Sequence, residues 1–142
     1  ELLYRSGAGL TPRPLRRIAS GGELSRVMLA SKVVLGNADG VDTLVFDEVD
    51  AGVGGSTARA LASVLADLAA THQVIVVTHL AQVAVMADKH YVVSKEPGDV
   101  PQTHLDEVTG EARTAEIARM LSGDQSEASL AHAKQMLEEA RG

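Results

Sequence analysis

The chain has 142 residues, of which 45% are apolar and only 2% aromatic, and its formal net charge is −6. This composition fits one domain, or one lobe of a larger domain, with an aliphatic core, and it indicates neither a disordered chain nor a membrane partner. The absence of cysteine excludes disulfides and thiolate metal sites. The negative net charge argues against strong DNA binding by this chain alone. The basic cluster Arg13, Arg16 and Arg17 either contacts an acidic partner or nucleic acid, or is a solvated loop.

Hydrophobic periodicity divides the chain into alternating strands and helices. Ser20 and Glu23 form a capping box in front of the first helix, and Asp124 and Glu127 form another in front of the last. Gly36 is predicted to stop the first helix. The predicted elements in chain order are a weak strand at 1–6, a loop at 7–14, a helix up to residue 35, a buried strand at 43–46, a Gly-rich loop at 50–55, a helix capped by Ser56, a buried strand at 74–78, a short helix at 81–87, a strand at 90–94, an edge strand at 102–108 and two final helices.

The succession of strand, helix, strand, helix and strand from residue 43 to residue 94 predicts parallel pairing with right-handed crossovers. We therefore expect an α/β fold with a mostly parallel sheet flanked by helices. In such sheets, ligands bind beyond the C-terminal ends of the strands. Asp47 and Glu48 end one predicted strand and His79 ends the next, so this edge is the expected site.

Two adjacent carboxylates, Asp47 and Glu48, follow the apolar strand at 43–46. Phosphoryl transfer requires an acid that holds Mg²⁺ and a group that orients the attacking water. Since adjacent residues of an extended chain point to opposite sides, one carboxylate could serve the metal and the other the water. The alternative is a strand that ends in solvated acids.

Ser20, Gly21, Gly22 and Glu23 open the first predicted helix. A capping box explains Ser20 and Glu23 without any ligand. It leaves the two glycines unexplained, because glycine costs about 1 kcal/mol in a helix relative to alanine. Glycines in a first turn let a phosphate approach the backbone N–H groups at the positive end of the helix, and the Ser20 hydroxyl could add a donor.

His79 and the segment 50–55 are the remaining candidates. A lone His after a buried strand is commonly structural, but beside a γ-phosphate it could donate a hydrogen bond to the phosphate or to the attacking water. The glycines of 50–55 supply turns with positive φ, which an ordinary strand-to-helix loop also needs.

The order and spacing of these motifs resemble the ABC ATPases in their SMC-like form. SGGELSR at 20–26 resembles the signature motif, TLVFDEVD at 43–50 resembles a Walker B strand that runs into a D-loop, and Thr78-His79 resembles the switch histidine. The runs ASGGELSRVMLA, FDEVDAGVGG, VTHLAQVAVMADKHYVVSK and TAEIARMLSG are similar to the RecN family of SMC-like DNA-repair ATPases. A condensin-type SMC head would read more like DEVDAALD, whereas GVGG stands here.

The resemblance implies roles for individual residues. Asp47 would hold Mg²⁺, Glu48 would polarise the attacking water, and His79 would contact the γ-phosphate. The residues implied in ATP binding are Ser20, Gly21, Gly22 and Glu23 of the signature motif, which would face the γ-phosphate of ATP held by the opposite protomer, and Asp50 of the D-loop, which would cross the dimer interface.

The resemblance also implies that residues 1–142 are the C-terminal lobe of a P-loop ATPase head. Its partners would be the N-terminal half of the same head, a second protomer joined through an ATP-sandwiched dimer, and DNA bound by the full-length protein. ATP and Mg²⁺ would be its ligands. The implied work is DNA double-strand-break repair and recombination, in the cytoplasm at the nucleoid.

No phosphate loop of the form G-x-x-x-x-G-K-[ST] occurs in the sequence, since the Gly-rich residues 52–57 lack the Lys. Because the chain also begins with Glu1 rather than Met, we expect a fragment that is inactive alone. Two alternatives stay open. A transporter nucleotide-binding domain would carry Pro where Val49 stands, and a non-catalytic interaction domain with an ABC-like fold would have no need for both Glu48 and His79.

Overall fold

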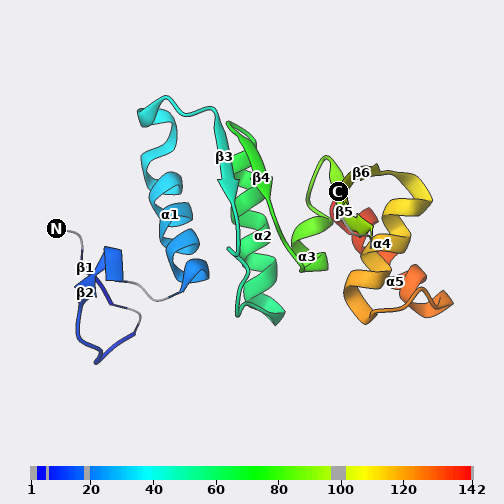
Figure 1. The fold of residues 1–142 in the computed structure, drawn as a ribbon, viewed down its shortest axis with the longest axis horizontal. Coiled ribbons are helices and arrows are strands. Elements are labelled where there is room, and N and C mark those ends of the chain that lie inside the picture. The colour runs from blue at the N-terminus through cyan, green and yellow to red at the C-terminus, as the bar shows by residue number, and fades with distance from the viewer. Residues whose placement is uncertain (1–2, 6, 18–19, 97–101, 142) are drawn as a thin grey trace. The chain divides into compact units, whose positions relative to one another are not determined.

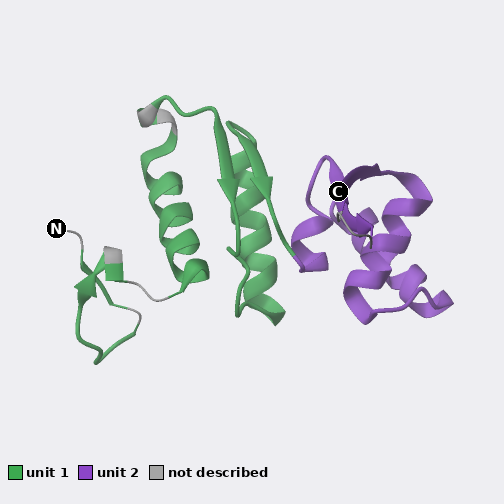
Figure 2. Ribbon diagram, viewed as in Figure 1, with its two compact units in different colours: residues 1–78 green, residues 79–142 purple. Residues whose placement is uncertain are grey.

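A computed structural model of the chain describes residues 3–5, 7–17, 20–96 and 102–141, which form two compact units, residues 1–78 and 79–142 (Figure 2). The elements of the first unit are β1 (Leu3–Tyr4), β2 (Arg13–Pro14), the 3₁₀ turns η1 (Leu15–Arg17) and η2 (Gly36–Asp39), α1 (Gly21–Leu35), β3 (Thr43–Phe46), α2 (Gly55–Ala69) and β4 (Gln73–Val76) (Figure 1). Those of the second are α3 (Ala81–Ala84), β5 (His90–Glu96), β6 (Gln102–Val108), α4 (Gly110–Ser122) and α5 (Glu127–Glu139). None of the described helices is both long and apolar enough to span a bilayer.

Strands β3 and β4 pair in parallel, in a register that sets Leu44 against Val74. Two further backbone bonds extend the pair at its ends, from the Gln73 amide to the Asp42 carbonyl at 2.8 Å and from the Val77 amide to the Phe46 carbonyl at 2.9 Å. Helix α2 forms the crossover and contacts β4. The predicted strand–helix–strand unit with parallel pairing is confirmed here.

The predicted mostly parallel sheet is not confirmed. Among the described residues, β1–β2 and β5–β6 are antiparallel pairs, and β3–β4 alone is parallel. Strand β5, predicted as the third parallel strand, pairs along its whole length with β6. Only five residues separate the two strands. That length suits an antiparallel hairpin, whereas a parallel pair needs a crossover of a dozen residues or more.

The β3–β4 pair is covered on one face only in the part of the chain that the structure describes. Leu44 and Phe46 of β3 are buried, whereas Val45 between them is 65% exposed and Ile75 of β4 is 46% exposed. The apolar stripe of α2 completes the buried face; its buried members are Ala58, Leu61, Ala62, Leu65 and Leu68. The predicted buried strands at 43–46 and 74–78 are therefore covered on one face only among the described residues.

The second unit has its own core, in which α4 and α5 pack together and α3 packs on α4. Ile117, Ala118 and Ala133 are its fully buried residues, and Ile117 is the largest of them. Arg113 of α4 donates from Nη2 to the carbonyls of Ala84, Val85 and Ala87 at 3.2, 3.3 and 2.6 Å. These bonds satisfy carbonyls at the end of α3, which closes at Ala84 rather than at residue 87 as predicted.

The helix ends confirm one predicted cap and correct two. Ser20 caps α1, since its Oγ accepts from the Glu23 amide at 3.2 Å. Helix α2 begins after Gly54, so the predicted cap at Ser56 is wrong. Helix α5 is capped by Ser126 rather than by Asp124. The Asp124 carboxylate accepts instead from three serines of the turn between α4 and α5; these are Ser122, Ser126 and Ser129.

Candidate functional site

The acidic segment after β3 is a tight turn, with Glu48 in the left-handed region at φ 55°. The Ala51 amide donates to the Glu48 carbonyl at 3.0 Å, and the Val53 amide donates to the Asp50 carbonyl at 3.0 Å. A side chain in this conformation costs roughly 1–2 kcal/mol. Strain of this kind persists only where the surroundings hold it, and it concentrates at functional sites. The predicted need for positive φ in 50–55 is confirmed at Gly52 and Gly55.

The first turn of α1 lies directly against this acidic turn. A Cβ built on Gly21 would overlap Oε2 of Glu48, and one built on Gly22 would lie 2.8 Å from both the Glu48 carbonyl oxygen and the Ala51 Cβ. The two glycines that the capping box left unexplained thus have a packing reason within the chain. They let the start of α1 approach the backbone of the acidic turn more closely than any other residue would allow.

This packing places the Glu48 carboxylate at the N-terminal end of α1. The free N–H groups and the positive end of the helix dipole stabilise an anion there. Sequence reasoning expected a phosphate at this helix end; the neighbour that the structure describes is a carboxylate of the same chain. Ser20, Asp47 and Glu48 are all exposed, so these groups are open to a ligand.

Ser25 and Arg26, the two residues that follow Leu24 in α1, hold the backbone of the acidic turn. Ser25 Oγ donates to the Asp47 carbonyl at 2.6 Å, and Arg26 Nη1 donates to the carbonyls of Val49 and Ala51 at 3.2 and 2.9 Å. Both residues lie within the signature run SGGELSR, whose pattern assigns neither of them a role. The one signal was their position, about one helical turn beyond the two glycines.

Asp50 lies inside the first unit, with 2% of its surface exposed. Its Oδ2 accepts a hydrogen bond from Thr78 Oγ1 at 2.5 Å. Sequence reasoning expected Asp50 to cross a dimer interface as part of a D-loop. In the structure its carboxylate points to the segment that follows β4 in its own chain, and the neighbouring Val49 is fully buried.

The predicted site residues of the first unit therefore come together, from the start of α1 and from the turn after β3. They are Ser20, Gly21, Gly22, Glu23, Asp47, Glu48 and Asp50. His79 follows Thr78 directly and is exposed, as the first residue of the second unit.

A magnesium ion fits this site only with ligands from outside the chain. Among the described residues, no group of three or more His, Cys, Asp or Glu side chains is placed to hold a metal. Mg²⁺ in nucleotide enzymes is usually held by one or two carboxylates, substrate phosphates and water. The exposed Asp47 carboxylate is a donor of that kind, so the residues present fit a metal that arrives with a nucleotide.

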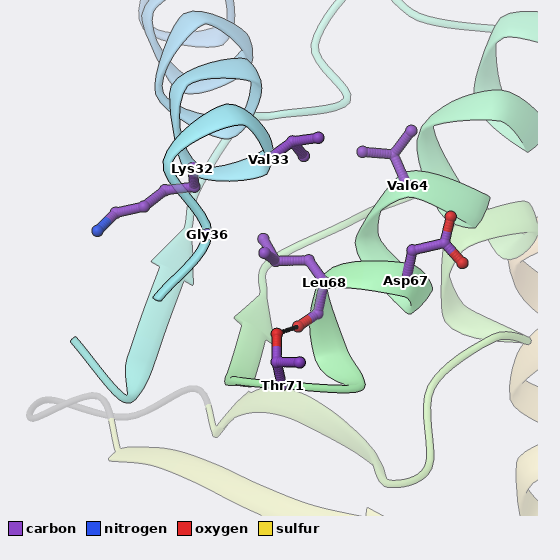
Figure 3. Close-up of a pocket in the computed structure, with 7 residues that line it drawn as sticks. All are labelled: Lys32, Val33, Gly36, Val64, Asp67, Leu68 and Thr71. Atoms are coloured by element: carbon purple, nitrogen blue, oxygen red, sulfur yellow. Dashed lines mark hydrogen bonds between the residues drawn. The ribbon is translucent and has the colours of Figure 1, made fainter. Parts of the chain in front are cut away.

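A separate cleft of about 260 Å³ opens between the C-terminal ends of α1 and α2 (Figure 3). The side chains of Val33 and Val64 face each other across it. The 15-residue length of α1 corresponds to about 22 Å, so the cleft lies at the opposite end of the helix from the acidic turn. It brings together none of the predicted site residues. Its lining residues are Lys32, Val33, Gly36, Val64, Asp67, Leu68 and Thr71.

The comparisons with known proteins agree with the family resemblance. The chain is 53% identical over 139 residues to the DNA repair protein RecN of Treponema pallidum and 53% identical over 137 residues to that of Deinococcus radiodurans, in each case over 96% of this chain and 24% of the relative. It is 50% identical over 143 residues to the RecN of Streptomyces coelicolor, over 99% of this chain and 25% of the relative. The chain thus spans about a quarter of the length of these relatives. No protein-family model matches it.

A solved structure from work on the ATP-driven dimerization and DNA-stimulated activation of SMC ATPases superposes with a TM-score of 0.52 at 21% identity. The match covers 95% of this chain and 69% of that one. At this identity the likeness concerns the fold, and it confirms an α/β fold of the SMC ATPase type. Identities near one half over nearly the whole chain favour the RecN resemblance over the transporter alternative.

Proposed function

Because the chain is similar to RecN proteins over nearly its whole length, we propose that it supplies the signature and Walker B residues of an ATPase head that works in DNA repair. One observation carries the proposal: the exposed carboxylate of Glu48, on a strained turn at a strand end, lies against two glycines at the positive end of α1. A solvated acid at a strand end would need neither the strain nor the close approach of the helix. The relatives are DNA repair proteins, and the proposed work is double-strand-break repair and recombination at the nucleoid in the cytoplasm.

In the proposed reaction, Glu48 orients the water that attacks the γ-phosphate of ATP and accepts its proton. Asp47 holds Mg²⁺, which neutralises charge on the phosphates when it is bound. His79 donates a hydrogen bond to the γ-phosphate. Asp47 and Glu48 are adjacent on a tight turn. Because backbone carbonyls of this turn accept hydrogen bonds from α1, the backbone positions of the two acidic residues are fixed relative to each other.

The proposed active form is a dimer of heads with ATP sandwiched between them. Ser20, Gly21 and Gly22 bind the γ-phosphate of the nucleotide held by the opposite protomer, and Glu23 belongs to the same nucleotide-binding motif. The acidic turn acts as the D-loop and faces the same interface. Asp50 stabilises this loop by accepting a hydrogen bond from Thr78 within its own chain. DNA is bound by the full-length protein.

The N-terminal half of the same head is the proposed partner of the open face of β3–β4. Parallel strands are normally covered on both faces, and Val45 and Ile75 are exposed on this one. That half also has to supply the phosphate loop with its Lys, which this sequence lacks. The isolated chain should therefore bind Mg-ATP too weakly for calorimetry to detect, and micromolar binding would contradict the two-half arrangement.

The decisive experiment uses the full-length form, meaning a chain of the relatives' length that contains these residues. Glu48→Gln keeps the size of the side chain but removes its charge and basicity, so steady-state phosphate release should fall by roughly 10²–10⁴-fold. ATP affinity should survive, and ATP-bound dimers should accumulate in sizing chromatography. Glu138→Gln, at an exposed carboxylate of α5, is the matched control.

Two outcomes would reject the mechanism. Hydrolysis by Glu48→Gln at the wild-type rate would make Glu48 a solvated strand-end acid. Absence of hydrolysis by the unmutated full-length form would favour a non-catalytic interaction domain with an ABC-like fold.

A further inference from the structure

The two backbone carbonyls that flank Glu48 are both held by side chains of α1. Ser25 Oγ donates to the carbonyl of Asp47, before Glu48, and Arg26 Nη1 donates to the carbonyl of Val49, after it. Arg26 Nη1 also reaches the carbonyl of Ala51, which closes the same turn. The peptide group before Glu48 and the one after Val49 are therefore anchored to one helix, and the Glu48 carbonyl between them accepts from the Ala51 amide.

These anchors act on a residue whose backbone conformation is strained. Glu48 has φ 55°, a value that a glutamate adopts only when its surroundings enforce it. Relaxation to an extended conformation would rotate the flanking carbonyls away from their donors and would swing the Glu48 carboxylate off the start of α1. The guanidinium of Arg26 suits this task, because it is planar, always charged and offers several donors in a rigid arrangement.

We propose that Arg26, assisted by Ser25, is a positioning residue that sets the direction of the Glu48 carboxylate through the backbone of the acidic turn. The inference rests on the proposed role of Glu48 in ATP hydrolysis and adds two residues to that machinery. The same two donors belong to the helix whose first turn is proposed to bind the nucleotide of the opposite protomer.

Arg26→Met in the full-length form tests the proposal, because Met keeps the length and removes the donors. Single-turnover hydrolysis should slow by roughly 10- to 100-fold, as expected for a misplaced catalytic group. ATP affinity should stay near that of the wild type, whereas the melting temperature should fall because two bonds to the acidic turn are lost. Arg26→Lys, which keeps the charge but loses the fork of donors, should recover part of the rate. Arg59→Met, at an exposed arginine of α2, is the matched control and should have no effect.

The double variant separates positioning from other roles. If Arg26 acts through Glu48, then Arg26→Met should cause no further loss in a Glu48→Gln background. Losses that multiply, or a loss of ATP affinity that matches the loss of rate, would overturn the proposal. If Arg26→Met does not fold, the same double-mutant cycle is measured with Ser25→Ala. Ser25→Ala should then lower the hydrolysis rate several-fold in the wild-type background and should cause no further loss in the Glu48→Gln background.

The proposal and the function on which it rests fail in different ways. If Glu48→Gln hydrolyses ATP at the wild-type rate, the proposed function fails first. If Glu48→Gln is impaired while Arg26→Met and Ser25→Ala are both as active as the wild type, only the positioning role fails.

Discussion

Thr78 Oγ1 donates to Oδ2 of the buried Asp50 at 2.5 Å, which ties the segment after β4 to the acidic turn after β3. Thr78→Val removes this donor from a carboxylate that has little access to water, and we expect a local cost of about 1.5–3 kcal/mol. Hydrogen exchange should then speed up at the amides of Ala51 and Val53, which close the turn. Thr78→Ser keeps the hydroxyl and should exchange like the wild type. Unchanged protection in Thr78→Val would show that the bond does not hold the turn.

Gly21 and Gly22 should respond differently to alanine, although both substitutions remove a helical glycine. A Cβ at position 22 meets the carbonyl of Glu48 and the Cβ of Ala51, which are fixed parts of the turn, so Gly22→Ala should destabilise the fold by about 1–3 kcal/mol. A Cβ at position 21 meets only the end of the Glu48 side chain, which can move. Gly21→Ala should therefore leave the melting temperature unchanged or raise it.

The activities of the two glycine variants complete this prediction. Gly21→Ala displaces the Glu48 carboxylate, so its ATP hydrolysis should fall even though it is as stable as the wild type. Melting curves and phosphate release measured on the same preparations check both statements. A Gly22→Ala protein as stable as Gly21→Ala would mean that α1 does not lie this close to the turn.

Ser20→Arg in the full-length form should block ATP-driven pairing of heads and leave the first nucleotide-binding event intact. Arg at this position removes the cap that accepts from the Glu23 amide and crowds the N-terminus of α1, where the nucleotide of the opposite protomer is proposed to bind. Light scattering with and without ATP measures pairing, and calorimetry measures nucleotide binding. Ser20→Thr, which keeps a capping hydroxyl, is the control. Normal ATP-dependent dimers in Ser20→Arg would contradict the proposed role.

Asp47→Asn should differ from Glu48→Gln in its dependence on Mg²⁺. If Asp47 holds the metal, loss of its charge should raise the Mg²⁺ concentration needed for half-maximal hydrolysis and weaken nucleotide-dependent pairing. Glu48→Gln should change the maximal rate with little effect on that concentration. A magnesium titration of hydrolysis, run in parallel on both variants, checks this difference. Identical Mg²⁺ dependence in Asp47→Asn and the wild type would reject Asp47 as the metal ligand.

Asp124 should stabilise the turn before α5 in a pH-dependent manner. Hydrogen bonds from Ser129, Ser126 and Ser122 lower the pKa of Asp124 from 3.8 to about 2. Because the folded-state pKa lies below the usual value, the stabilisation is fully present above about pH 4 and is lost as the pH falls towards 2. Asp124→Ala should therefore lower the melting temperature at neutral pH, and the gap to the wild type should close over that acid range. Glu138→Ala, at an exposed carboxylate, is the control. A difference in melting temperature between Asp124→Ala and the wild type that persists near pH 2 would contradict the proposed role of the Asp124 carboxylate.

Local pattern predicted much of the secondary structure and the candidate residues. Helical spacing of apolar side chains identified α1, and the capping box identified Ser20 as its cap. An apolar run identified β3, and β6 was predicted with its bounds at Gln102 and Val108. These features depend on residues within a few positions of one another, which is why sequence reasoning recovers them. The acid pair after β3 was found for the same reason.

The errors in strand pairing and burial concern features that depend on a second element, whereas the caps predicted at Ser56 and Asp124 were each wrong by two residues within a local turn. The partner of β5 follows from the short connection to β6, which overrides the expectation of a continuing parallel sheet. Asp124 has the right chemistry for a cap, but Ser126 takes that place because Asp124 accepts from the serines around it. The apolar run of β3 predicted a buried strand, yet only alternate residues are buried, because burial depends on whether another element covers each face.

The sequence by itself determined the resemblance to RecN proteins, the acidic strand end and the glycines that open α1. Only the tertiary structure decided what those glycines contact, and that Ser25 and Arg26 hold the carbonyls around Glu48. These bonds join residues 22 to 25 positions apart, and their acceptors are backbone carbonyls, which every residue carries. A donor to a distant carbonyl therefore leaves no pattern in the sequence, because the contact exists only once α1 has packed against the turn.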